Sequence, residues 1–235
     1  MNHVAEQKGF TIIELMLAMT FVSVLLIAIA LTIVQIGTIY NKGITLKEVN
    51  QSGRAISDDL RRTIGSSSTF AVSRSVVTTQ AGGRICTGQF SYIWNTADAL
   101  TQNNPSVVRF TGSNQPQIRL LKVPDSSGQY CERNSQGAPT VTTVQTTTPS
   151  TAVELLKSGD RTLSIHQLAV TQQANGRSAA GQQLISLTFT IGTGDVTALT
   201  TDRTSCSPPG APGSNFAYCA VQQFSLVIRA GDGVN

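Results

Sequence analysis

The chain has 235 residues and a small net charge of +4. Beyond an apolar N-terminal segment about 170 residues remain, which is enough for one compact domain with its own hydrophobic core. The two histidines, His3 and His166, are far apart in the sequence, and there is no Gly-x-Ser-x-Gly elbow or glycine-rich phosphate loop. These features argue against an enzyme, and we expect no cofactor and no small-molecule substrate.

The N-terminal segment places an acid, Glu14, at the edge of a long apolar run that has no further charge until Lys42. Insertion of a carboxylate into a membrane costs roughly 2.5–3.5 kcal/mol, so an acid at this place suggests a functional role. The carboxylate needs a cation at the same depth as its partner. Cleavage after Gly9 would create such a cation, the new α-amino group of Phe10, on a neighbouring copy. This chemistry indicates a subunit that polymerises from a membrane.

The segment Gly9-Phe10-Thr11-Ile12-Ile13-Glu14 resembles the cleavage and methylation site of type IV prepilins and pseudopilins. In that family a short polar leader ends in Gly, the mature chain begins with Phe, and Glu is its fifth residue. The resemblance implies a leader at 1–9, cleavage between Gly9 and Phe10 by a prepilin peptidase, and methylation of the new amine. It also implies that Glu14 pairs with the Phe10 amine of an adjacent pilin subunit during assembly on a membrane platform. An ordinary signal anchor with one stray acid is the alternative.

The apolar run is long enough to cross a membrane. Residues 15–36 have only Thr20, Ser23, Thr32 and Gln35 as polar interruptions, and about 20 helical residues span a bilayer core. We expect a single-pass protein in contact with membrane lipid, with the transmembrane half of a helix at 10–40 and its hydroxyl groups bonded to their own backbone. The resemblance implies a leader on the cytoplasmic side of the plasma (inner) membrane, a head outside it, and a pilus or pseudopilus after assembly.

Residues 41–66 predict an amphipathic half of the same helix. Apolar residues and one glycine follow a three-four spacing, namely Ile39, Leu46, Val49, Gly53, Ile56 and Leu60. We expect this face to pack on the protein's own sheet, with a coiled-coil seam as the alternative. Residues 53–62 also resemble the corresponding stretch of minor pilins of the W type and of the type II secretion pseudopilin J.

The remainder, 67–235, predicts a β-rich extracytoplasmic head. Short β-branched and aromatic runs between turn signals predict strands at 76–79, 85–94, 107–111 and 118–123. Period-two alternation predicts further antiparallel strands at 183–191 and 220–229 and, less regularly, at 163–170. A surface loop is expected at 134–151 and a helical turn at 153–157. The expected fold class is α+β, with a long N-terminal helix packed on a mainly antiparallel, pilin-like head.

Four cysteines lie in the predicted head: Cys86, Cys131, Cys206 and Cys219. An even number in an exported region indicates two disulfides. Of the three possible connectivities we favour the sequential one, Cys86 with Cys131 and Cys206 with Cys219. The second pair would bound a loop similar to the C-terminal disulfide loop of pilins. A zinc site is the alternative, although the close Cys-x-x-Cys pairs of such sites are missing.

Two further binding roles are alternatives for the head. DNA binding would need a basic patch, to which scattered arginines could contribute: Arg74, Arg84, Arg109, Arg119 and Arg177. Such cations also serve solubility and block the pairing of strand edges. Because some pseudopilins bind calcium, Asp195, Asp202 or Asp232 are candidate ligands, although EF-hand spacing is absent. His166 is expected to be a half-buried strand residue.

The sequence is therefore interpreted as a minor pilin or pseudopilin subunit of a type IV pilus or a type II secretion-like filament. It would be processed by prepilin peptidase and assembled through its N-terminal helix. The alternative is a membrane-anchored surface adhesin, or a DNA-binding module of a DNA-uptake system, that uses the same anchor.

Overall fold

The computed structural model describes residues 9–112, 117–145, 152–156, 162–177 and 182–231, with the backbone alone at 174–177. The chain divides into two units, Met1–Asn41 and Lys42–Asn235. Helix α1, Ile12–Gly65, is unbroken through 54 residues and belongs to both. The expected long N-terminal helix is thus confirmed.

The end of α1 is set by small polar residues. After Gly65 the hydroxyls of Ser66 and Ser67 donate to the carbonyls of Thr63 and Ile64 at 3.2 and 2.7 Å. The last carbonyls of a helix have no partner within it, so these bonds replace water at its end.

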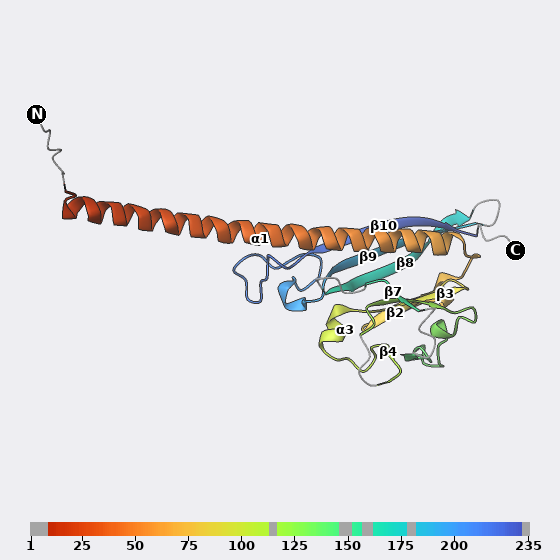
Figure 1. Cartoon of the computed structure of the whole chain (residues 1–235). Coiled ribbons are helices and arrows are strands. Elements are labelled where there is room, and N and C mark those ends of the chain that lie inside the picture. Colours follow the sequence, from red (N-terminus) through yellow and green to blue (C-terminus); the bar gives the residue numbers. More distant parts are fainter. Residues whose placement is uncertain (1–8, 113–116, 146–151, 157–161, 178–181, 232–235) are drawn as a thin grey trace, which may run out of the picture. The chain divides into compact units, whose positions relative to one another are not determined.

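Two antiparallel sheets build the second unit (Figure 1). Within the described residues the larger sheet has the order β1-β2-β3-β5-β7 and the smaller the order β10-β9-β8. The larger sheet consists of β1 (Val76–Thr79), β2 (Gly82–Cys86), β3 (Phe90–Asn95), β5 (Leu120–Pro124) and β7 (Val153–Glu154). The smaller sheet consists of β8 (Leu163–Arg177), β9 (Gln183–Thr193) and β10 (Val221–Ala230). The observed class is α+β, with antiparallel sheets as expected.

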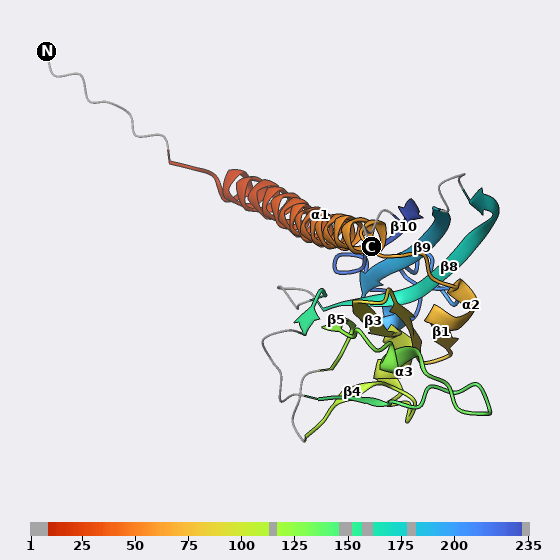
Figure 2. The ribbon, with the colours of Figure 1, turned by 90° about the vertical axis from the view of Figure 1, so that its right-hand side faces the viewer.

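Short elements connect the strands. They are the helices α2 (Val72–Ser75) and α3 (Ala97–Thr101), the 3-10 turns η1 (Gln129–Cys131) and η2 (Val196–Ala198), and the parallel pair of β4 (Arg109–Phe110) with β6 (Thr143–Val144). Strand β4 lies on the side of the larger sheet that is turned away from α1 (Figures 1 and 2).

The run expected as one strand at 85–94 is two strands. β2 ends at Cys86, and the Thr87 N–H donates to the Phe90 carbonyl at 2.9 Å. Gly88 has a φ of +91°, a conformation that glycine adopts without steric cost. The Gly88 turn therefore interrupts the apolar run and reverses the chain.

The helical turn expected at 153–157 is wrong. Val153 and Glu154 form β7, which pairs with Lys122 and Leu121 of β5. The Glu154 carboxylate also accepts the Leu120 N–H at 2.7 Å, so the edge of β5 supplies a partner that local sequence does not reveal. Lys157 lies outside the described residues. The expected strand at 107–111 is reduced to β4, and the expected loop at 134–151 contains β6, with 146–151 outside the described residues.

The alternation predicted for the later strands is confirmed, except that Thr190, whose side was expected to face water, is 3% exposed. Side chains of β9 that were expected on one face are fully buried, namely Ile185, Leu187, Phe189 and Ile191. Three of them lie opposite apolar residues of β10, in the pairs Phe189 with Phe224, Leu187 with Leu226 and Ile185 with Ile228. Apolar cross-strand pairs of this kind stabilise the register.

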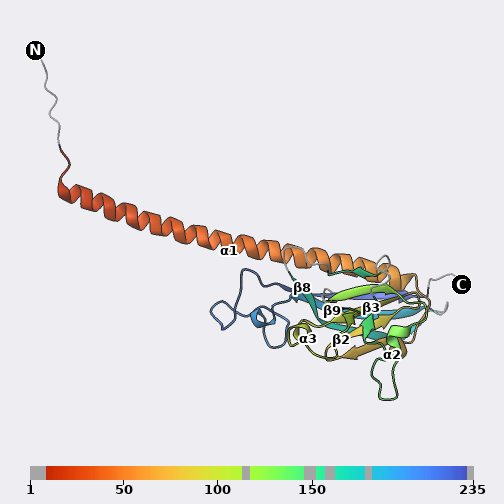
Figure 3. The same cartoon turned by 60° about the horizontal axis from the view of Figure 1, so that its bottom comes forward.

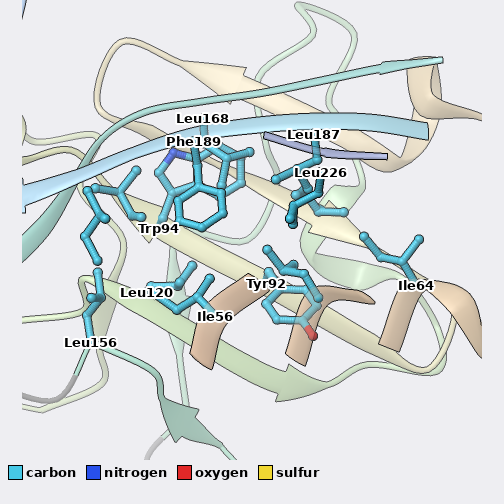
Figure 4. Close-up of a cluster of buried hydrophobic side chains, with 14 of the residues drawn as sticks. Ile56, Ile64, Tyr92, Trp94, Leu120, Leu156, Leu168, Leu187, Phe189 and Leu226 are labelled. Atoms are coloured by element: carbon cyan, nitrogen blue, oxygen red, sulfur yellow. The ribbon is translucent and has the colours of Figure 1, made fainter. Parts of the chain in front are cut away.

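One core joins the packed part of α1 to both sheets (Figure 4). The helix contributes Val49, Ile56, Leu60 and Ile64. Strand β3 contributes Tyr92 and Trp94, and the smaller sheet contributes the β9 face described above. The other face of the larger sheet is covered by a second cluster that includes Ile93, Leu121 and Tyr130. Because both faces are buried, β3 carries apolar residues on both, such as Tyr92 and Ile93, and its sequence does not alternate between apolar and polar residues.

Candidate processing and assembly site

Gly9 and Phe10 lie ahead of the first turn of α1, which begins at Ile12. Both residues are exposed, and the Phe10 residue is 88% exposed. Exposed backbone outside regular structure is where proteolysis concentrates, because no secondary structure has to be broken. The peptide bond between Gly9 and Phe10 is therefore sterically open to a protease.

Glu14 is bonded to Thr11 within the chain. The backbone N–H and the hydroxyl of Thr11 both donate to Glu14 Oε2 at 2.9 Å, and the Glu14 N–H donates to Thr11 Oγ1 at 3.3 Å. These reciprocal bonds form a capping box, which satisfies free N–H groups at the start of a helix. The role of Thr11 was not predicted from the sequence, although Thr-x-x-Glu before an apolar run is the signal for it.

The part of α1 after Glu14 exposes its apolar side chains. Large hydrophobic residues from Leu15 to Tyr40 are 44–70% exposed. Soluble monomers rarely leave so large an apolar surface in water. Among the described residues, α1 is the helix that is long and apolar enough to cross a membrane.

Polar groups in this stretch are satisfied locally. Hydroxyls donate to the carbonyl three or four residues earlier, from Thr20 to Leu17, from Ser23 to Met19 and from Thr32 to Ala28, at 2.8–2.9 Å. The expected bonding to the helix's own backbone is confirmed for these three residues. In lipid such bonds remove the cost of an unsatisfied hydroxyl.

The packed face of α1 differs from the predicted face at two positions. Val49, Gly53 and the residues that follow on the stripe are buried as expected. Ile39, however, is 70% exposed, and Leu46 is 36% exposed with Thr45 fully buried in its place. Positions 45 and 46 both fit a period of 3.6 residues before Val49, so spacing alone does not distinguish them. The predictions for Ile39 and Leu46 are wrong.

Polar contacts tie the same face of α1 to the larger sheet. Asp59 accepts from the Tyr92 hydroxyl at 2.7 Å and from Lys122 Nζ at 2.9 Å. Lys122 also donates to Thr63 Oγ1 at 2.8 Å. Burial above all raises the pKa of the Tyr92 hydroxyl, which therefore remains a hydrogen-bond donor to Asp59. The helix is thus held by apolar packing and by a directed polar cluster.

The cystines join Cys86 to Cys131 and Cys206 to Cys219. This is the sequential connectivity favoured from the sequence, and it leaves no thiolate for a zinc site. Lys42 of α1 contacts the second loop, since its Nζ donates to the Cys219 carbonyl at 2.6 Å and lies 4.6 Å from the centre of the Phe216 ring.

The arginines proposed for a basic patch are in different environments. Arg84 is 3% exposed, and its NH1 donates to the Tyr130 carbonyl at 2.8 Å. Burial lowers the pKa of the Arg84 guanidinium, which lines a cavity of about 300 Å³ with Trp94 and Asn95. Arg119 is half-buried, whereas Arg74 and Arg109 are exposed, and the side chain of Arg177 lies outside the described part. A buried guanidinium such as that of Arg84 cannot contact a DNA backbone.

The candidate calcium ligands serve local turns. Asp195 accepts the N–H of Thr197 at 3.0 Å. Asp202 accepts the hydroxyls of Thr200 and Thr204, and these bonds lower the pKa of Asp202 to about 2. Asp232 lies outside the described residues. In the described chain no three His, Cys, Asp or Glu side chains form a group that could hold a metal ion.

His166 is buried more deeply than expected, at 5% exposure. Its Nε2 lies 3.1 Å from the Thr193 carbonyl, so this nitrogen carries the proton and donates. Burial lowers the pKa of His166 below its usual value. The residue is a neutral donor that ties β8 to β9.

Comparison of the chain with family models, curated proteins and solved structures found no match.

Proposed function

We propose that the chain is a minor pilin or pseudopilin subunit, cleaved between Gly9 and Phe10 and assembled through its N-terminal helix. Its filament would be a type IV pilus or a type II secretion-like pseudopilus. The proposal is supported by the order of features along α1. An exposed Gly9–Phe10 bond is followed by Glu14, which is hydrogen-bonded to Thr11 in a capping box. After Glu14 the helix has an exposed apolar stretch, and its last half is packed on a folded head.

In this proposal Thr11 and the Phe10 amine hold Glu14 at successive stages. Before cleavage, the two bonds from Thr11 offset part of the cost of placing a carboxylate at the membrane edge. Cleavage then creates a cationic amine on Phe10. Both bonds from Thr11 use Oε2, so the amine of an adjacent subunit can approach the other oxygen. Pairing of the two charges would fix the axial stagger between neighbours.

The remaining parts have structural roles in the proposed filament. The apolar surface of α1 contacts lipid while the subunit is in the membrane and contacts other subunits after extraction. Both environments keep this surface out of water. The head, stabilised by two cystines, provides a surface for specific contacts outside the membrane. The proposed partners are a prepilin peptidase, other pilin subunits and a membrane assembly platform, and the proposed role is structural rather than enzymatic.

The assembly role of Glu14 can be separated from its capping role by two variants. Glu14→Ala removes the carboxylate, whereas Thr11→Val removes the hydroxyl that bonds to it and leaves the carboxylate in place. We expect both subunits to be cleaved, Glu14→Ala to be lost from filaments, and Thr11→Val to be incorporated nearly as well as wild type. Wild-type incorporation of Glu14→Ala would refute the pairing role. Equal defects in both variants would show that Glu14 acts only as a helix cap.

A further inference from the structure

The loop between Cys206 and Cys219 has an unusual surface for a segment in water. It contains no charged residue. Its aromatic residues Phe216 and Tyr218 are 41% and 40% exposed. Transfer of exposed rings on an uncharged loop out of water lowers the free energy of the system. Amphipathic aromatic side chains are enriched at membrane–water interfaces, where the ring lies among lipid head groups.

The contacts of β10 place this loop at one end of the head. The Cys219 carbonyl, just before β10, accepts from Lys42 of α1. The Gly231 N–H, just after β10, donates to the Ser67 carbonyl at 2.9 Å. β10 therefore runs alongside α1 in the same direction, and the loop before it lies at the Lys42 end of the head (Figure 3, dark blue).

Lys42 closely follows the apolar run. Ile36 and Lys42 are six residues apart in the sequence, which is at most about 20 Å of chain in any conformation. The head-group layer beyond each side of the hydrocarbon core is roughly 5–8 Å thick. If residues 15–36 fill the hydrocarbon core, Lys42 is the first cation after the core that can reach these head groups, and the Phe216 ring centre lies 4.6 Å from its Nζ.

We propose that the loop between Cys206 and Cys219 is a lipid-contact surface. Phe216 and Tyr218 insert among the head groups of the outer leaflet, beside the ammonium group of Lys42. The cystine keeps the loop short and the Phe216 ring near this cation. The inference rests on the proposed membrane span, and it adds a second lipid contact, made by the head. Extraction of the subunit into a filament would then require the loop to leave the lipid surface.

Tryptophan fluorescence in lipid vesicles tests this contact on the full chain. The native Trp94 is 1% exposed in the core and gives a constant background, measured with wild type. A second tryptophan is introduced by Phe216→Trp, which keeps an aromatic ring beside Lys42, by Leu25→Trp in the middle of the apolar run, or by Val227→Trp on the exposed face of β10. Val227 is 63% exposed and serves as the matched control on the head. The quenchers are phosphatidylcholines brominated either near the head-group end or near the methyl end of their acyl chains.

We expect Phe216→Trp to lose emission with the shallow quencher and Leu25→Trp to lose it with the deep quencher. Val227→Trp should lose none with either. Quenching of Leu25→Trp without quenching of Phe216→Trp would overturn the loop contact and leave the span intact. Quenching of neither would overturn the membrane span and with it the membrane part of the proposed function. Equal quenching of Phe216→Trp and Val227→Trp would also overturn the proposal, because it would show non-specific adsorption of the head.

Discussion

Gly53 of α1 lies directly against the ring of Phe224 of β10, so closely that a Cβ atom on Gly53 would overlap the ring. The same ring stacks on Phe189, with 5.1 Å between the ring centres. The helix and the smaller sheet can approach to this distance because position 53 carries no side chain. This contact sets the spacing between α1 and the strands beneath it.

Gly53→Ala is therefore expected to destabilise the head by about 1–3 kcal/mol, because the added methyl group displaces Phe224 from its stack. The matched control is Gly43→Ala, where a Cβ meets no atom within 4 Å and the higher helix propensity of alanine should add about 0.5–1 kcal/mol. Urea unfolding of the full chain in detergent micelles, followed by the fluorescence of buried Trp94, measures both. A neutral or stabilising Gly53→Ala would show that α1 is not held at this spacing.

The polar cluster at Asp59 gives a second prediction. Asp59→Asn removes the ionic partner of Lys122 and weakens the acceptor of the Tyr92 hydroxyl, so we expect a loss of about 1–3 kcal/mol in the free energy of unfolding. Asp58→Asn is the control, since Asp58 is the exposed neighbour with the same charge, and surface changes usually stay within about 0.5 kcal/mol. Equal effects of the two substitutions in the same urea experiment would refute a specific role of the cluster.

Burial of His166 predicts a loss of stability in mild acid. Its pKa is lower in the folded chain than its usual value of 6.5, so the unfolded chain binds the proton more tightly between these two values. Two opposite charges face it, Asp98, which raises its pKa, and Arg203, which lowers it. The free energy of unfolding should fall as the pH decreases through 6.5 toward the folded pKa.

The variant His166→Gln can still donate to the Thr193 carbonyl but does not titrate, so the pH dependence of its stability in this range should be smaller. Urea midpoints at about pH 8 and about pH 5, on either side of the usual histidine pKa, measure the difference. An unchanged pH dependence in the variant would attribute the acid sensitivity to other groups.

The two cystines are expected to differ in their contribution to stability. Their sequence separations are 45 residues for Cys86–Cys131 and 13 for Cys206–Cys219. In the chain-entropy model the longer loop contributes about 4 kcal/mol and the shorter about 3 kcal/mol. Replacement of each pair by serine should therefore destabilise the head, and the first pair should cost more. A larger loss from the second pair would mean that its cystine also stabilises packing, through the contact of Lys42 with that loop.

Period-two patterns in the sequence were sufficient to predict β9 and β10, because each has one buried apolar face that alternates with polar residues. The division of 85–94 into two strands was not predicted, since burial of both faces hides the period and the turn at Gly88 is marked by one glycine. At Val153–Glu154 the strand depends on a pairing with β5 that is distant in the sequence. Such a partner leaves no local signal.

Within the candidate site, Gly9, Phe10 and Glu14 were predicted because their order and spacing form a pattern. Thr11 belongs to the same pattern as the other half of a capping box, but its hydrogen bonds to Glu14 were recognised only in the structure. The contact of Lys42 with the Cys206–Cys219 loop could not be predicted, because it joins residues far apart in the chain that share no motif. The burial of Arg84 was likewise hidden, since a lone arginine in a strand usually faces water.

The most direct test of the proposed function is mass spectrometry of the N-terminus of the subunit recovered from cells that contain a prepilin peptidase. We expect a chain that begins at Phe10 and carries one N-methyl group. Gly9→Leu should retain the leader as a control. Recovery of the wild-type protein only as the uncut chain beginning at Met1 would contradict the proposal, because the amine that is to neutralise Glu14 would never form.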